Sequence, residues 1–267
     1  MQIFQRRSGA ALALLGAGTA LGGLVSAGCG STSTDATARI RAVDVATNAG
    51  TAAILVNSGA AGGDLTFGTV TPYNFIGQGA DTFAFTTTAT LPANITYPPG
   101  PTLTLNNNSF YTAYLIGRSD VNGKADPRFL QALITGDRGA AANYTGAVVY
   151  ADPPSGQANV RIINGAPDAG AVDVTINGKP GFSAVAYPAF PVIPLGQTTA
   201  NAPAPATLYQ AVPAGTLSVQ VNAAGTATVL VPSTNVSVSG GNSYTIVVTE
   251  PAVTPTYGLQ TLSDQQQ

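Results

Sequence analysis

Two groups of oxygen-bearing side chains have a spacing that suits a metal site. Asp168 and Asp173 lie five positions apart across a glycine-containing segment. Asp120, Asn122 and Asp126 occupy the first, third and seventh positions of a short polar segment. Calcium takes about six to eight oxygen ligands, and carboxylate and amide oxygens are the ligands it prefers. Each group is therefore a candidate calcium site.

Ordinary structural roles compete with calcium at both places. Arg161 and its counterpart Arg41 lie among apolar residues of strand-like pattern, where an arginine is expected to be half-buried and paired. Asp173 is the candidate partner of Arg161, and the carboxylate of Asp168 could instead close a turn. Asn122 precedes a glycine, a pair that favours a tight hairpin turn, and no closing glutamate follows it. We therefore expect a structural ion pair between Arg161 and Asp173, with calcium as the alternative.

Composition removes most catalytic classes. The 267 residues include no histidine and a single cysteine, so a Ser-His-Asp triad, a Cys-His pair and a histidine-ligated metal are all excluded. Charged residues make up 8%, with 10 basic and 12 acidic side chains, so no nucleic-acid partner is expected. One cysteine closes no disulfide within the chain. We expect neither an enzyme nor a cofactor, and a hydrolase built on paired aspartates is the least favoured alternative.

The first 28 residues have the pattern of a cleaved export signal. Arg6 and Arg7 form a basic start, an apolar run follows over residues 9–25, and small residues end it. A membrane-spanning helix is the alternative interpretation, but it needs about 20 strongly apolar residues, and glycines interrupt this run. The paired arginines leave open whether export follows the general or the twin-arginine route.

The end of the signal resembles the lipoprotein box of bacteria. Residues 25–29 read VSAGC, and the resemblance implies cleavage before Cys29 and fatty acylation of that residue, as by palmitate. Gly30 follows in place of the aspartate that retains lipoproteins in the inner membrane, which favours the outer membrane. Residues 29–37 are then a short tether. We expect a lipid-anchored cell-envelope protein, on the periplasmic or the surface face; a plain secreted protein is the alternative.

The mature chain contains an internal repeat. Four blocks align in the same order: residues 39–43 with 159–163, 73–85 with 209–221, 111–112 with 244–245, and 130–133 with 259–262. The repeat predicts two domains, over residues 38–150 and 156–267. The second copy has a proline-rich insertion that begins near Tyr187 and Phe190. Because proline does not join the interior of a sheet, we expect a long apolar loop, which contacts a partner or covers its own domain.

Each copy is predicted to be all-β. Apolar residues alternate over residues 172–177, 217–221 and 244–248, which places one face of each strand in a core and the other in water. Glycine and asparagine between these runs favour hairpin turns. About seven short strands in each copy predict two tandem immunoglobulin-like antiparallel β-sandwiches. Tyr111 and Tyr244, each at the start of a late strand, are candidate tyrosine corners that bond back to the backbone.

The opening of the second copy carries a family resemblance. Residues 158–174 read ANVRIINGAPDAGAVDV, and residues 212–217 read VPAGTL. Both segments resemble motifs of a bacterial family of domains of unknown function, numbered 4397. The resemblance implies extracytoplasmic β-sandwiches, often in tandem, over nearly all of residues 38–264, and it brings no assigned activity. The histidine of the family motif is replaced by Asn164 here and by Asp44 in the first copy.

These observations favour a non-catalytic role. We expect two β-sandwich modules, held at the membrane by a lipid, that serve envelope structure or bind an envelope protein or polysaccharide. The alternative is an adhesin-like module that binds carbohydrate or another matrix component. Without tryptophan, such a module would stack sugars on tyrosines. The candidates are Tyr73, Tyr97, Tyr187 and Tyr209.

Overall fold

The computed structural model describes most of the chain after residue 36. The described residues are 37–77, 79–88, 102–105, 110–121, 126, 128–137, 152–187, 209–251 and 256–264. They belong to one compact unit, Asp35–Gln267. The predicted signal segment, Cys29, Tyr97, Asn122 and Phe190 lie outside the described residues. Within the described part, no helix is long and apolar enough to cross a membrane.

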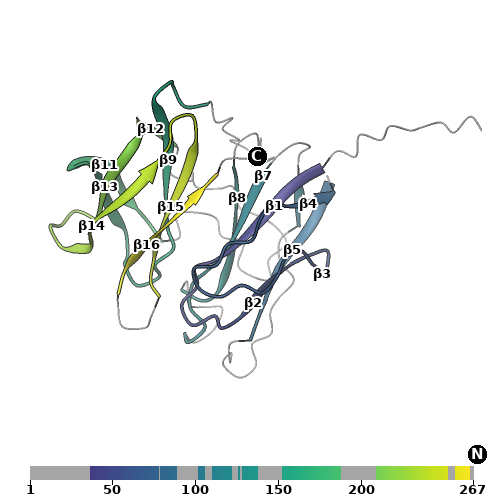
Figure 1. Ribbon diagram of the computed structural model, residues 1–267. Coiled ribbons are helices and arrows are strands. Elements are labelled where there is room, and N and C mark those ends of the chain that lie inside the picture. Colours follow the sequence, from purple (N-terminus) through teal and green to yellow (C-terminus); the bar gives the residue numbers. More distant parts are fainter. Residues whose placement is uncertain are drawn as a thin grey trace, which may run out of the picture. The chain divides into compact units, whose positions relative to one another are not determined.

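The described chain forms sixteen strands, eight in each half (Figure 1). The first half holds β1 (Thr37–Asp44), β2 (Ala52–Val56), β3 (Gly59–Ala60), β4 (Asn74–Gly77), β5 (Gly79–Thr87), β6 (Thr102–Leu105), β7 (Phe110–Ile116) and β8 (Gln131–Gly136). The second holds β9 (Gln157–Asn164), β10 (Val172–Ile176), β11 (Lys179–Val185), β12 (Gln210–Pro213), β13 (Gly215–Ala223), β14 (Val229–Val238), β15 (Ser243–Thr249) and β16 (Gly258–Ser263).

The two halves share one topology. The first consists of two four-stranded sheets, with strand orders β4-β1-β7-β8 and β3-β2-β5-β6, and the second repeats them as β12-β9-β15-β16 and β11-β10-β13-β14. The prediction of all-β sandwiches is therefore confirmed. The sheets differ from the expected purely antiparallel pattern, because β1 pairs with β7, and β9 with β15, in parallel.

The register also corrects one block of the sequence alignment. β7 and β15 pair with β8 and β16 so that residues 131–136 correspond to residues 258–263. The sequence alignment of residues 130–133 with 259–262 is thus two positions out of register. An even shift keeps apolar side chains on the same face of a strand, so the alternating pattern alone did not reveal it.

Each half has its own core between its two sheets. Alternate residues of β1 and β7, among them Ile40 and Leu115, pack there against Ile54, Phe83 and Phe85 of the facing sheet. The core of the second half is built in the same way from β9 and β15 on one side and β10 and β13 on the other. Period-two alternation of apolar residues on facing sheets gives this arrangement.

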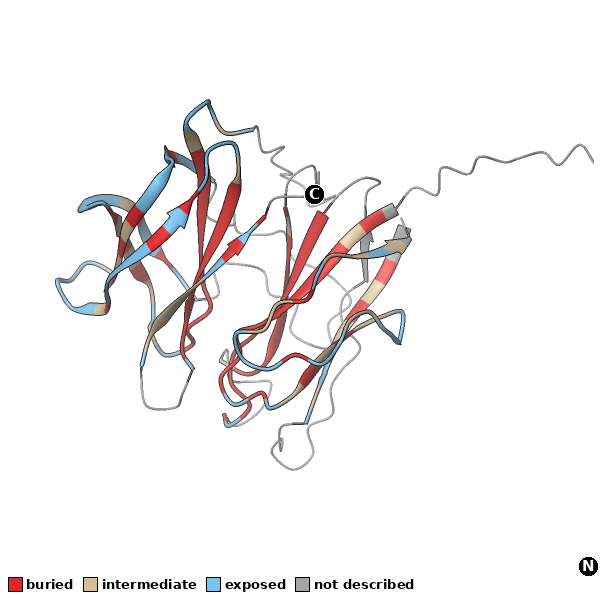
Figure 2. Ribbon diagram, viewed as in Figure 1, coloured by how far each residue is buried: buried red, intermediate tan, exposed pale blue. Residues whose placement is uncertain are grey.

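The central strands β7 and β15 are buried on both faces of their sheets. Every residue of β7 and β15 is buried, and Figure 2 shows both strands red along their length. The residues that do not face their own core form a third apolar cluster drawn from both halves, including Val43, Tyr114, Ile163 and Val247. The expectation that residues 244–248 turn one face to water is therefore wrong: that face packs against the other half.

Candidate functional site

Four charged side chains lie within the contact between the two halves, and we call them the arginine–aspartate box. Arg41 comes from β1 and Arg161 from β9, while Asp137 and Asp264 directly follow β8 and β16. The two arginine side chains are 6% and 1% exposed, and both aspartates are fully buried. Two positive and two negative charges balance within the box. Such burial is tolerated only when charges are paired and hydrogen-bonded.

Arg41 reaches from the first half into the second. Its Nε donates to Oγ1 of Thr112 in its own half, at 2.8 Å. Its Nη1 donates to the backbone oxygen of Ser263 at 2.6 Å, and its Nη2 bonds to the carboxylate of Asp264. One face of the guanidinium lies 4.8 Å from the ring centroid of Tyr73.

Arg161 makes the reciprocal set of contacts. Its Nε donates to Oγ1 of Thr245 at 2.6 Å, its Nη1 to the backbone oxygen of Gly136 at 2.9 Å, and its Nη2 to Asp137 at 2.6 Å. Its guanidinium lies 4.7 Å from the ring centroid of Tyr209. Each arginine thus bonds to a threonine of its own half and to the aspartate of the other half.

Tyrosine and threonine hydroxyls complete the box. Tyr73 donates to Asp137 at 2.7 Å, and Tyr209 donates to Asp264 at 2.5 Å. Thr245 also donates to Asp264, at 2.5 Å. Burial raises the pKa of the Asp264 carboxyl, an effect that the neighbouring arginines oppose. The donors and acceptors of the box bond to one another, so its role is to hold the two halves together.

The box corrects the ion pair expected from the sequence. Arg161 is fully buried, and its partners are Asp137 and Asp264. Asp173 instead accepts hydrogen bonds from the backbone N–H groups of Ala184 and Gly225, at 2.7 and 2.8 Å, which lower its pKa. Asp137 and Asp264 were missed because the two-residue misalignment hid their correspondence.

The candidate calcium ligands lie mostly in a second ionic cluster. Asp120 binds Arg118 through two bonds of 2.8 and 2.6 Å, and the same arginine bonds to Asp168 across the two halves. The backbone N–H of Asp168 donates to Glu250 at 2.9 Å. The hydrogen bond from Arg118 is the largest cause of the lowered pKa of Asp120. The structure therefore brings Asp120 and Asp168 together, but around an arginine.

Arg128 takes up the remaining acidic candidate. It binds Asp126 at 2.8 Å and Asp168 at 2.9 Å. Asp173 lies elsewhere, on β10, and Asn122 is outside the described residues. Over the ranges that the structure describes, no group of three or more acidic or cysteine side chains is arranged to hold a metal ion.

The three other predicted positions that the structure describes are tyrosines that contact the rest of the protein. The hydroxyl of Tyr244 accepts the backbone N–H of Ser239 at 2.9 Å, five residues upstream. Tyr111 is buried in the first core and pairs with Ile40. Tyr187 is half-buried and packs against the apolar cluster between the halves. Its side chain is therefore only partly exposed, and Phe190 lies outside the described residues.

Asp44 and Asn164 end the first strand of each half in the same way. Oδ1 of Asp44 accepts the backbone N–H of Ala46 at 2.9 Å, and Oδ1 of Asn164 accepts that of Ala166 at 3.2 Å. Nδ2 of Asn164 also donates to two backbone oxygens. Oδ2 of Asp44 is buried without a hydrogen-bond partner, and burial raises the pKa of this carboxyl to about 6.

Breaking a buried ion pair of the box should lower the free energy of unfolding more than breaking an exposed ion pair. Asp137→Ala leaves Arg161 buried without its closest partner, so we expect a loss of about 3–5 kcal/mol in the free energy of unfolding. The control Asp126→Ala breaks a pair whose arginine is 42% exposed and should cost less than about 1 kcal/mol. Urea unfolding followed by circular dichroism measures both. Equal losses for the two variants would contradict the role of the box.

Asp44 predicts a pH-dependent stability. The pKa of the Asp44 carboxyl is about 6 in the folded protein, above its ordinary value of 3.8. The ionised carboxylate therefore lowers the free energy of unfolding at pH values above about 6. Asp44→Asn should raise the free energy of unfolding by about 3 kcal/mol at pH 8, and the gain should vanish as pH falls through 6 to below 4. Urea unfolding at each pH tests this. The reciprocal variant Asn164→Asp should destabilise at pH 8, and a pH-independent gain for Asp44→Asn would refute the assignment.

The comparison with known protein families agrees with the resemblance seen in the sequence. Residues 158–267 match the family described as Domain of unknown function (DUF4397). The matched segment runs from within β9 through β16, and it includes Arg161 and Asp264 of the box. No curated protein matches the chain. The second half of the chain, over residues 158–267, is therefore similar to the DUF4397 family.

Proposed function

We propose that the protein is an exported, lipid-anchored component of the bacterial cell envelope whose two β-sandwich modules act as one non-catalytic body. Its role is to support envelope structure or to hold a binding surface at a set distance from the membrane. The arginine–aspartate box is the observation that carries the proposal. The export signal and Cys29 supply the anchor, and the outer membrane is the proposed site.

Burial explains why the modules would act together. Separating them would expose the apolar cluster that contains Val43 and Val247, and it would break the bonds of Arg41 to Asp264 and of Arg161 to Asp137. Residues that follow the strands of one half thus complete the ionic contacts of the other. A joint of this kind suits a spacer or a presenting scaffold, because a flexible linker would not fix the direction of the outer module.

The carbohydrate-binding alternative loses support from the tyrosines. Tyr73 and Tyr209 lie against the arginines of the box and donate their hydroxyls to its aspartates. Tyr187 packs into the contact between the halves. These rings are thus committed within the protein, whereas sugar stacking needs an open aromatic face.

The lipid anchor is tested by fractionation of cells that produce the chain. We expect the wild type in the outer-membrane fraction, labelled by an alkyne analogue of palmitate, and Cys29→Ala in the soluble fraction without label. Ser31→Ala, two residues away, is the matched control and should behave as the wild type. Label in Cys29→Ala, or a soluble wild type, would count against the proposal.

The envelope role is tested by crosslinking with mass spectrometry on intact and on protease-shaved cells. We expect crosslinks to other envelope components from the wild type. Their survival after shaving places the protein on the periplasmic face, and their loss places it on the surface. Crosslinks only to cytoplasmic proteins would overturn the proposal.

A further inference from the structure

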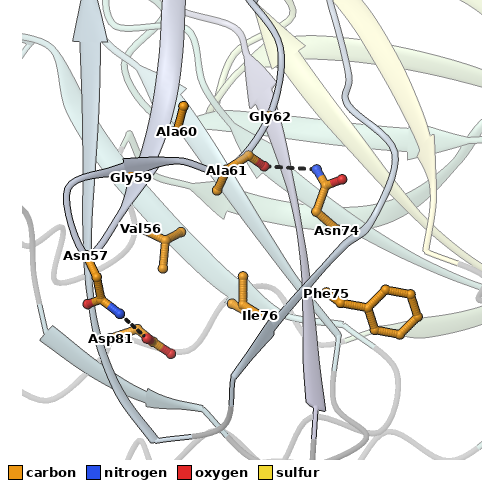
Figure 3. A pocket seen from close by; sticks show the side chains of 10 residues that line it. All are labelled: Val56, Asn57, Gly59, Ala60, Ala61, Gly62, Asn74, Phe75, Ile76 and Asp81. Atoms are coloured by element: carbon orange, nitrogen blue, oxygen red, sulfur yellow. Dashed lines mark hydrogen bonds between the residues drawn. The ribbon is translucent and has the colours of Figure 1, made fainter. Parts of the chain in front are cut away.

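The first half has an open groove that borders β3 and β4, which are edge strands of its two described sheets. The groove has a volume of about 450 Å³ and lies between the β2–β3 turn and β4 (Figure 3). In the described sheets, β3 and β4 each pair on one side only. Val56, Ala61 and Ile76 form its apolar wall and pack against the first core.

One carboxylate lies buried at this groove. Asp81 of β5 is 7% exposed, and its Oδ1 accepts a hydrogen bond from Nδ2 of Asn57 at 2.6 Å. Asn57 has a positive φ of 50°. Its Oδ1 accepts a hydrogen bond from the Thr82 backbone N–H at 2.9 Å, which fixes the position of its side chain. Oδ2 of Asp81 is buried and has no hydrogen-bond partner. A buried oxygen without a partner costs free energy, unless a ligand supplies a donor.

In the second half, the position equivalent to Asp81 is occupied by a core residue. The register equates Asp81 with Leu217, which is 1% exposed. The first half thus has a carboxylate in place of leucine. This difference makes the space acidic.

We infer that this groove binds a lysine or arginine side chain of a partner polypeptide, with the cationic head on Asp81 and the aliphatic stem along the apolar wall. Charge complementarity selects the head, because a cation satisfies a buried carboxylate best. The edges of β3 and β4 leave backbone groups beside the groove that an extended chain can bond and a simple amine cannot. Phe75 points away from the groove, so no ring offers a sugar a stacking face there (Figure 3).

This inference goes beyond the envelope role and holds whether or not Cys29 is acylated. The test uses the purified full chain and an acetylated, amidated pentapeptide with a central lysine between valines and threonines. Binding is measured by NMR titration. We expect the lysine peptide to shift the Asn57 and Asp81 resonances, and a peptide with norleucine in place of lysine to bind at least tenfold more weakly.

Two variants and one control locate the interaction. Asp81→Leu installs the residue of the second half and should weaken binding of the lysine peptide at least tenfold, while raising the melting temperature. Asp81→Asn keeps the shape, removes the charge and should also weaken binding. Asp64→Asn removes an exposed carboxylate and should leave binding unchanged.

Four results would overturn the inference. Two are equal binding of the lysine and norleucine peptides, and unchanged binding by both Asp81 variants. The third is butylamine binding as tightly as the lysine peptide, which would assign the groove to a free alkylamine. The fourth is Asp81-dependent binding of cell-wall oligosaccharides, which would assign it to a saccharide. None of these results affects the fractionation test of the lipid anchor.

Discussion

The rest of the structure depends on two reciprocal ion pairs between the modules. Arg41 pairs with Asp264, and Arg161 pairs with Asp137. A buried arginine is stable only when hydrogen-bond acceptors surround its guanidinium group. For both arginines, a backbone oxygen and an aspartate of the other module are among these acceptors. Neither module alone supplies all the hydrogen-bond partners of its own arginine. The two modules are therefore parts of one folded object, and the polar centre sets how they pair.

The apolar cluster around the box gives the contact its favourable free energy, and the box gives it specificity. Val43, Ile163 and Val247 would tolerate several packings, because apolar contacts are not directional. Hydrogen bonds from Arg161 to the Gly136 backbone and to Asp137 admit only one. The parallel pairing of β1 with β7 and of β9 with β15 brings each arginine beside its own threonine.

The modules share a topology but not a surface. Where the second module buries Leu217, the first has Asp81 and an open groove. A buried carboxylate in place of a core leucine costs stability, and the first module still has Phe83 and its neighbours to hold its sheets together. The contact between the modules adds to that support. One module is thus free to diverge in its surface while the other keeps a complete core.

The sequence by itself determined the all-β class, the repeat and the family resemblance of its second half, because alternation, turn residues and short motifs are local properties of a chain. It also indicated that Arg161 is half-buried and paired. Only the tertiary structure decided the partner, because Asp173 is near Arg161 in sequence while Asp137 lies in the other module. The same holds for Asp168, whose carboxylate oxygens pair with Arg118 and Arg128 of the first module. Pairing across a duplicated fold depends on how whole sheets pack, and no local pattern of residues encodes that.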